Sequence, residues 1–128
     1  MRLLLDTHIL LWAVAESRRL SKEARSLLED PENAVYFSAA SLWEISIKSA
    51  LRRDDFRIDP VALHAALRDT GFVELPITGA HALGVASLPP IHRDPFDRLL
   101  VAQSMQEPLI LLTNDDVLAR YGSGVRIV

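Results

Sequence analysis

The residues of this sequence that could do chemistry are carboxylates, and several of them come after apolar runs typical of buried strands. Four stand out: Asp6, Glu44, Asp97 and Asp115. The carboxyl ends of parallel strands meet at one edge of a sheet, so we expect acids near such ends to lie together. The chain contains no cysteine, and oxygen ligands without sulfur favour Mg²⁺ or Mn²⁺. The pattern suggests phosphodiester cleavage, in which such ions activate water.

Each acid also has a purely structural interpretation, because carboxylates cap helix N-termini. Asp6 is placed to cap a helix after the first strand, and Asp94 precedes Pro95 at the start of another helix. Ser41 and Glu44 have the spacing of a capping box. Capping does not require four acids at one sheet edge, however, where each close pair would cost on the order of 4 kcal/mol without a cation. The group as a whole therefore favours a metal site.

Strands and helices alternate in the elements that must position these acids. Continuous apolar runs predict strands over residues 2–5, 34–37, 72–75, 109–112 and 125–128. Helical spacing of apolar residues predicts helices over residues 9–15, 21–29, 39–51, 60–67, 78–86 and 95–106. Apolar strands joined by helices indicate an α/β fold, a central parallel sheet of four to five strands flanked by helices on both faces.

Length and composition are those of one ordinary globular domain covering residues 1–128, which are 49% hydrophobic and 24% charged. A net charge of −3 argues against binding nucleic acid through overall charge alone. Asp6 ends the first apolar run too early for a signal peptide, and no apolar stretch approaches a membrane span. Together with the lack of cysteine, these features favour the cytoplasm and no contact with a membrane.

Four segments carry the acids: LLLDTH from Leu3, SLWEI from Ser41, RDPFDRLLVAQ from Arg93 and LTND from Leu112. In this order they resemble the PIN-domain ribonucleases of the VapC toxin type. The resemblance runs from Met1 to the C-terminus, and its first and third segments are the more specific. It implies a PIN-like fold and an endoribonuclease that depends on one or two Mg²⁺ or Mn²⁺ ions. It also implies a homodimer, an RNA substrate and inhibition by a cognate antitoxin protein.

The resemblance assigns roles residue by residue. The catalytic acids, which also bind the metal, are Asp6, Glu44, Asp97 and Asp115. Supporting positions near the site are Asp94, Asp116, Thr113 and Ser38.

Cations near these segments are candidates for contacts with RNA phosphates. They are Lys48, Arg52, Arg53, Arg93 and Arg98. Lys48 lies one helical turn after Glu44, so a surface ion pair between them is the alternative. His8 and His92 form no recognisable metal-ligand pair and are interpreted as surface or structural residues. Trp12 and Trp43 lie within apolar faces, and core packing is expected for both.

Two other functions remain open at this stage. The first is a catalytically inactive PIN-like binding module, which would keep the sheet but lose part of the acid set. The second is a phosphatase of the aspartyl-phosphate type, which also has an Asp after its first strand. Such enzymes usually carry a second Asp two residues later, where this sequence has His8.

Overall fold

The predicted strands pair in parallel into one five-stranded sheet with the order β3-β2-β1-β4-β5. The structure, a computed structural model, describes residues 1–51 and 58–128. The strands are β1 (Arg2–Leu5), β2 (Ala34–Ser38), β3 (Val73–Leu75), β4 (Ile110–Thr113) and β5 (Val125–Ile127). The prediction of an α/β fold with a central parallel sheet is thus confirmed.

The helices begin and end within about two residues of their predicted bounds. They are α1 (Thr7–Val14), α2 (Lys22–Glu29), α3 (Ala39–Ala50), α4 (Pro60–Leu67), α5 (Gly79–Gly84) and α6 (Pro95–Gln106). Two short 3₁₀ helices cover Val85–Ser87 and Leu118–Tyr121. Helix α1 begins two residues before the predicted start because Asp6 caps it: the Asp6 carboxylate accepts a hydrogen bond from the amide of Ile9 at 2.9 Å.

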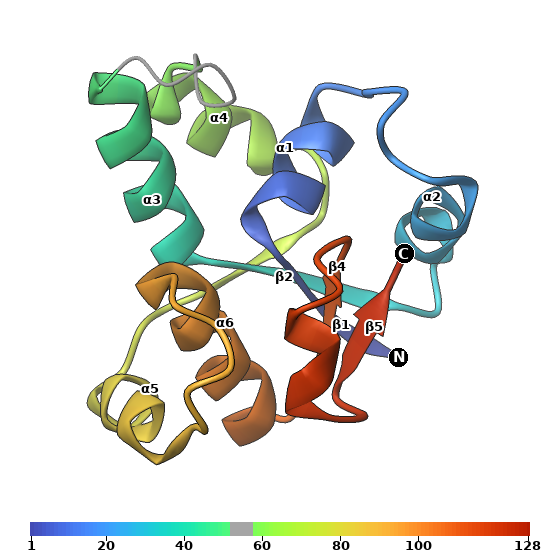
Figure 1. The fold of residues 1–128 in the computed structure, drawn as a ribbon. Coiled ribbons are helices and arrows are strands. Elements are labelled where there is room, and N and C mark those ends of the chain that lie inside the picture. Colours follow the sequence, from blue (N-terminus) through green and yellow to red (C-terminus); the bar gives the residue numbers. More distant parts are fainter. Residues whose placement is uncertain (52–57) are drawn as a thin grey trace.

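Helices cover both faces of the sheet, and the leucines of the central strand β1 divide between the two layers (Figure 1). Leu3 and Leu5 belong to the core that includes buried residues of α1, α2 and α4. Leu4 belongs to the opposite core, which includes buried residues of α6 and the 3₁₀ helix Leu118–Tyr121. All three leucines are completely buried, which explains why β1 is a continuous apolar run.

The parallel topology places the carboxyl ends of β1 and β4 side by side at the centre of the sheet edge. Leu5 pairs with Leu112, so the residues that follow the two strands emerge next to each other. The predicted acids Asp6 and Asp115 come just after these strands, and α3 follows directly from β2 on the other side of β1. Among the residues that the structure describes, no helix has the length and apolar character needed to cross a membrane.

Candidate active site

Asp6 is fixed at the sheet edge by hydrogen bonds to its backbone and to both carboxylate oxygens. Its amide donates to the carbonyl of Leu112 at 3.0 Å. Oδ1 accepts from the amide of Ile9, and Oδ2 accepts from the hydroxyl of Thr113. The residue is only 4% exposed, and this burial raises the pKa of the carboxyl group although the hydrogen bonds from Thr113 and Ile9 oppose the change. The site therefore contains an acid whose charge is poorly solvated.

Thr113 links the ends of the two central strands. Its hydroxyl donates to Asp6 and accepts a hydrogen bond from the amide of Asp115 at 3.0 Å. The carboxylate of Asp115 then accepts from the amide of Val117 at 3.0 Å, which fixes the turn after β4. The hydroxyl of Thr113 thus joins Asp6 and Asp115 in one hydrogen-bond network.

Glu44 is directed toward α1 and does not cap its own helix. Its Oε1 accepts a hydrogen bond from the hydroxyl of Thr7 at 2.6 Å, and its Oε2 lies 2.5 Å from Nζ of Lys48. The residue that caps α3 is Ser38, so the interpretation of Ser41 and Glu44 as a capping box is wrong. Glu44 is buried next to α1, with only 4% of the residue exposed. It is close enough to Asp6 for its negative charge to contribute to the raised pKa of Asp6.

Asp97 completes the group from the first turn of α6. Asp94 caps this helix by accepting hydrogen bonds from the amides of Phe96 and Asp97, as its position before Pro95 predicted. The pKa of Asp97 is raised to about 7. Burial is the largest cause, and the charges of Asp94, Asp6 and Glu44 raise it further, while His92 opposes them.

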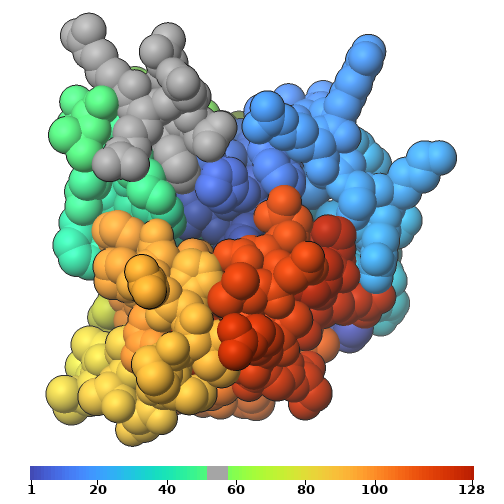
Figure 2. All heavy atoms as spheres, in the orientation of Figure 1, coloured from blue at the N-terminus to red at the C-terminus, as the bar shows by residue number. Residues whose placement is uncertain are grey.

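The four predicted acids therefore converge at the carboxyl edge of the sheet, although they come from four separate segments. The segments that carry them lie around α1 on the face shown in Figure 2, where α1 is blue, the start of α6 orange and the turn after β4 orange-red.

A family model for the PIN domain matches residues 3–124 of the chain. The chain belongs to the PIN domain family. Its fold is similar to solved structures that share little sequence with it. VapBC2 of Rickettsia felis bound to promoter DNA matches with a TM-score of 0.68 and 14% identity, over 100% of this chain and 98% of that one.

Two other solved structures resemble this PIN domain over nearly their whole length. The toxin VapC20 of Mycobacterium tuberculosis has a TM-score of 0.64 and 20% identity, over 97% of this chain and 98% of that one. A toxin–antitoxin complex from Klebsiella pneumoniae has a TM-score of 0.62 and 22% identity, over 96% and 94%. No curated protein matches the sequence. At these identities, the likeness to solved structures concerns the fold.

The acids of this PIN domain are suited to a hard divalent cation. All four offer carboxylate oxygens, and the chain has no cysteine. Burial, and to a smaller extent repulsion between the acids, raises the pKa of both Asp6 and Asp97, so the nearby donors and cations do not fully offset the cost of charging these two groups. A cation bound among these oxygens would offset more of that cost.

His92, expected from the sequence to be a surface or structural residue, lies beside two of the acids. Its Nε2 lies 2.8 Å from Oδ2 of Asp115 and 3.5 Å from Oδ2 of Asp97. Ligand atoms of these three residues all lie within 4.8 Å of one another, close enough to share a cation. Only its position in the segment before Asp94 and Asp97 could have singled it out.

Several predicted residues lie elsewhere or have other partners. The hydroxyl of Ser38 donates to the side chain of Gln103 in α6 at 2.6 Å and accepts from the amide of Ala40, so these hydrogen bonds join it to α6 and to the start of α3. Arg98 donates to carbonyl oxygens of its own chain, including those of Val85 and Pro89, both at 3.1 Å.

The remaining candidates for RNA contact differ in their surroundings. Lys48 forms the ion pair with Glu44 that the alternative interpretation described. Arg93 and Asp116 are exposed, whereas Arg52 and Arg53 lie outside the described residues.

The prediction that Trp43 packs in the core is wrong. Its side chain is 56% exposed, and its ring contacts Phe96 edge-to-face at a centroid distance of 5.0 Å. Trp12, which lies in α1, packs instead against the hydrophobic core, as expected.

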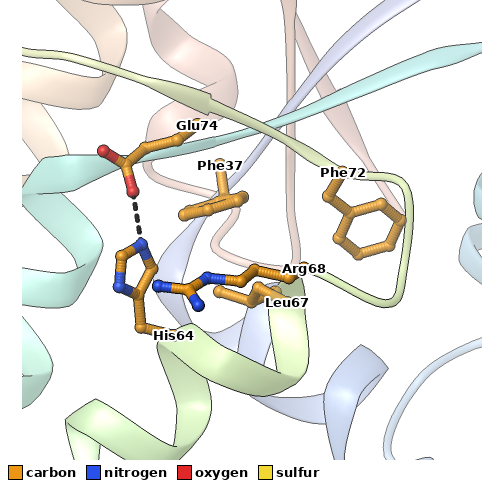
Figure 3. A pocket seen from close by; sticks show the side chains of 6 residues that line it. All are labelled: Phe37, His64, Leu67, Arg68, Phe72 and Glu74. Atoms are coloured by element: carbon orange, nitrogen blue, oxygen red, sulfur yellow. Dashed lines mark hydrogen bonds and ion pairs between the residues drawn. The ribbon is translucent and has the colours of Figure 1, made fainter.

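A separate pocket of about 130 Å³ lies between α4, the edge strand β3 and its neighbour β2 (Figure 3). Nε2 of His64 lies 2.8 Å from Oε1 of Glu74, and the guanidinium of Arg68 lies beside this pair. Phe37, Leu67 and Phe72 form its apolar part. None of the predicted acids lines this pocket, so it is distinct from the candidate active site.

Proposed function

We propose that this PIN domain is a metal-dependent endoribonuclease and the toxin of a toxin–antitoxin pair. The observation that carries the proposal is the convergence of Asp6, Glu44, Asp97 and Asp115 at one sheet edge, with the pKa of Asp6 and of Asp97 raised. The similar folds support it further, because VapC20 of Mycobacterium tuberculosis is described as a toxin that cleaves the sarcin-ricin loop, and other structures are toxin–antitoxin complexes.

In the proposed mechanism, Asp6 and Asp97 would hold one or two Mg²⁺ or Mn²⁺ ions, with Glu44 and Asp115 as further ligands. When bound, such an ion lowers the pKa of a coordinated water and stabilises negative charge on the phosphate. Thr113 and Thr7 orient the carboxylates of Asp6 and Glu44 by hydrogen bonds. Because these acids come from four segments, the fold fixes their relative positions before the substrate arrives, and that preorganisation favours catalysis.

The RNA backbone would be contacted by cations around the acids. Arg93 is exposed next to Asp94, and Lys48 lies beside Glu44. With a net charge of −3, the chain needs bound cations and these local side chains to accept a polyanion. We leave Arg98 out of this surface because its guanidinium already donates to carbonyl oxygens of the chain.

The proposed partners are a second copy of the chain and a cognate antitoxin. Helix α3, the residue that follows it and helix α4 expose large apolar side chains, which a protein interface would bury. These residues are Trp43, Ile47, Leu51 and Val61. Light scattering after size-exclusion chromatography measures whether the isolated chain is a homodimer, and the variant Trp43→Ser tests whether this surface is needed.

An aspartyl-phosphate phosphatase is the less suitable alternative. It would use Asp6 as a nucleophile together with a second Asp two residues later, where this sequence has His8. An inactive binding module would have no need of an intact acid set, and all four acids are present here.

The test is cleavage of labelled total tRNA and rRNA by the purified, antitoxin-free protein. Reactions contain Mg²⁺ or Mn²⁺, or EDTA, and are repeated with Asp6→Asn and Asp97→Asn. Asp69→Asn is the matched control, because Asp69 is exposed and remote from these acids in the sequence. We expect discrete, metal-dependent fragments from the wild type and the control, and none from the other two variants. Absence of cleavage by the folded wild type with either metal would favour the binding module.

A further inference from the structure

The loop that leads into α6 is held rigidly where it passes the acids. The amide of His92 donates to the hydroxyl of Tyr121 at 2.9 Å, and the guanidinium of Arg98 donates to the same hydroxyl at 3.2 Å. Arg98 also donates to the carbonyls of Pro89 and Val85. These contacts span the loop on both sides of position 92, so the backbone of His92 has a defined place at the site.

The ring of His92 is fixed from both of its nitrogens. Nδ1 accepts a hydrogen bond from the amide of Asp94 at 3.1 Å. A neutral ring whose Nδ1 accepts must carry its proton on Nε2. Nε2–H therefore donates to Oδ2 of Asp115 at 2.8 Å, and Oδ2 of Asp97 lies 3.5 Å away. The side chain is only 16% exposed, so water competes little for these contacts.

The short distances from Nε2 of His92 to Asp97 and Asp115 would allow His92 either to bind a cation or to donate a hydrogen bond to these acids. The hydrogen bond at Nδ1 distinguishes between these two roles. Nε2 could bind a cation directly, together with Asp97 and Asp115. It would then have to lose its proton, and the neutral ring would carry the proton on Nδ1, facing the amide of Asp94. Histidines that bind metals usually donate their other N–H to an acceptor, whereas the group facing Nδ1 here is a donor.

We propose that His92 is a positioning residue of the metal site: its Nε2–H holds Oδ2 of Asp115, adjacent to Oδ2 of Asp97, in the arrangement that binds the cation. This inference rests on the proposed metal-dependent function. Each carboxylate oxygen has a second lone pair, so a hydrogen bond from His92 leaves both acids able to bind the ion. Arg98 and Tyr121 act one step further out, because they fix the loop that carries His92.

Two conservative variants separate the functions of the two ring nitrogens. Asn carries an acceptor oxygen at the same number of bonds from Cα as Nδ1, so His92→Asn keeps an acceptor for the amide of Asp94 and loses the donor. Gln carries an amide nitrogen at the same number of bonds as Nε2, so His92→Gln keeps the donor and loses that acceptor. A positioning role predicts that Gln preserves metal binding and Asn does not, whereas a merely structural role predicts the reverse.

The experiment is calorimetric titration of the wild type and both variants with Mn²⁺, with thermal unfolding in EDTA as the measure of folding. We expect His92→Asn to lower the Mn²⁺ affinity about 10- to 100-fold, as loss of an outer hydrogen bond to a metal ligand does. His92→Gln should stay close to the wild type. Equal losses in both variants, or a greater loss in His92→Gln, would overturn the inference.

A second measurement does not depend on the variants. ¹⁵N NMR of the imidazole in the wild-type protein reports which nitrogen carries the proton, first without metal and then with Mg²⁺. We expect Nε2 to keep its proton in both states; loss of that proton on adding Mg²⁺ would make His92 a ligand and refute the positioning role. If the folded wild type bound neither Mn²⁺ nor Mg²⁺, the proposed metal-dependent function would itself fail and this inference with it.

Discussion

Replacing Asp97 by Asn should stabilise the metal-free protein at neutral pH while removing a proposed ligand. The pKa of Asp97 is raised from 3.8 to about 7, chiefly by burial and then by the charge of Asp94. Between these pH values the folded protein therefore binds more protons at this position than the unfolded chain does. The free energy of unfolding consequently falls as the pH rises from about 4 to 7.

The size of the effect follows from the pKa. Each pH unit between the two values corresponds to about 1.36 kcal/mol, so the charge of Asp97 costs the folded, metal-free protein at most about 4 kcal/mol above pH 7. The side chain is 21% exposed, which keeps the greater part of it away from water. Asn has nearly the same shape and no charge. We expect Asp97→Asn to raise the free energy of unfolding by about 1–4 kcal/mol at pH 8 and by little at pH 4.

Urea unfolding in metal-free buffer at pH 4, 6 and 8 measures this difference, with Asp69→Asn as the exposed control. Adding Mn²⁺ at pH 8 should then stabilise the wild type more than Asp97→Asn, because a ligand that binds only the folded state stabilises it. The reasoning would be refuted if Asp97→Asn changed stability equally at pH 4 and pH 8. It would also be refuted if Asp97→Asn destabilised the metal-free protein at pH 8.

Three further substitutions test the network around the acids. Thr113→Val removes the hydroxyl between Asp6 and Asp115, and should cost about 1–3 kcal/mol in urea unfolding and weaken Mn²⁺ binding; no change in either would contradict the network. Arg98→Lys should lower stability and Mn²⁺ affinity but leave RNA affinity in EDTA unchanged, whereas weaker RNA binding at unchanged stability would favour a phosphate contact. Ser38→Ala should cost about 1–2 kcal/mol through its cap and leave the cleavage rate of folded protein intact; a slower rate would place Ser38 in the site.

The fold could be predicted because the local signals agree with one another. The strands are continuous apolar runs, and the helices begin at strong caps, such as Ser21 before α2 and Asp94 with Pro95 before α6. Parallel pairing then follows from the alternation of strands and helices, and it brings the carboxyl ends of β1 and β4 together. The convergence of the acids could therefore be predicted from topology before any side chain was placed.

What could not be predicted depends on contacts between distant segments. His92 is held by Tyr121, 29 residues away in the sequence, and no local pattern indicates that hydrogen bond. Ser38 follows a strand like the acids do, yet its hydroxyl bonds to Gln103, 65 residues away. Trp43 lies one helical turn after the buried Ala40, but periodicity does not say where the covered face of α3 ends, and this ring remains exposed.

The capping and metal-binding interpretations of the acids are compatible, because the fold gives both roles the same location. In a parallel sheet the helix after a strand begins at the carboxyl edge, so the residue that caps α1 also faces the site. Asp6 uses one lone pair of Oδ1 for the amide of Ile9, and a carboxylate offers about four such positions. Capping would ordinarily favour the charged form of an acid, yet the pKa of Asp6 is raised. The hydrogen bond from the start of α1 therefore offsets only part of the cost of burying this charge, and a cation shared with Asp97 would offset more of it.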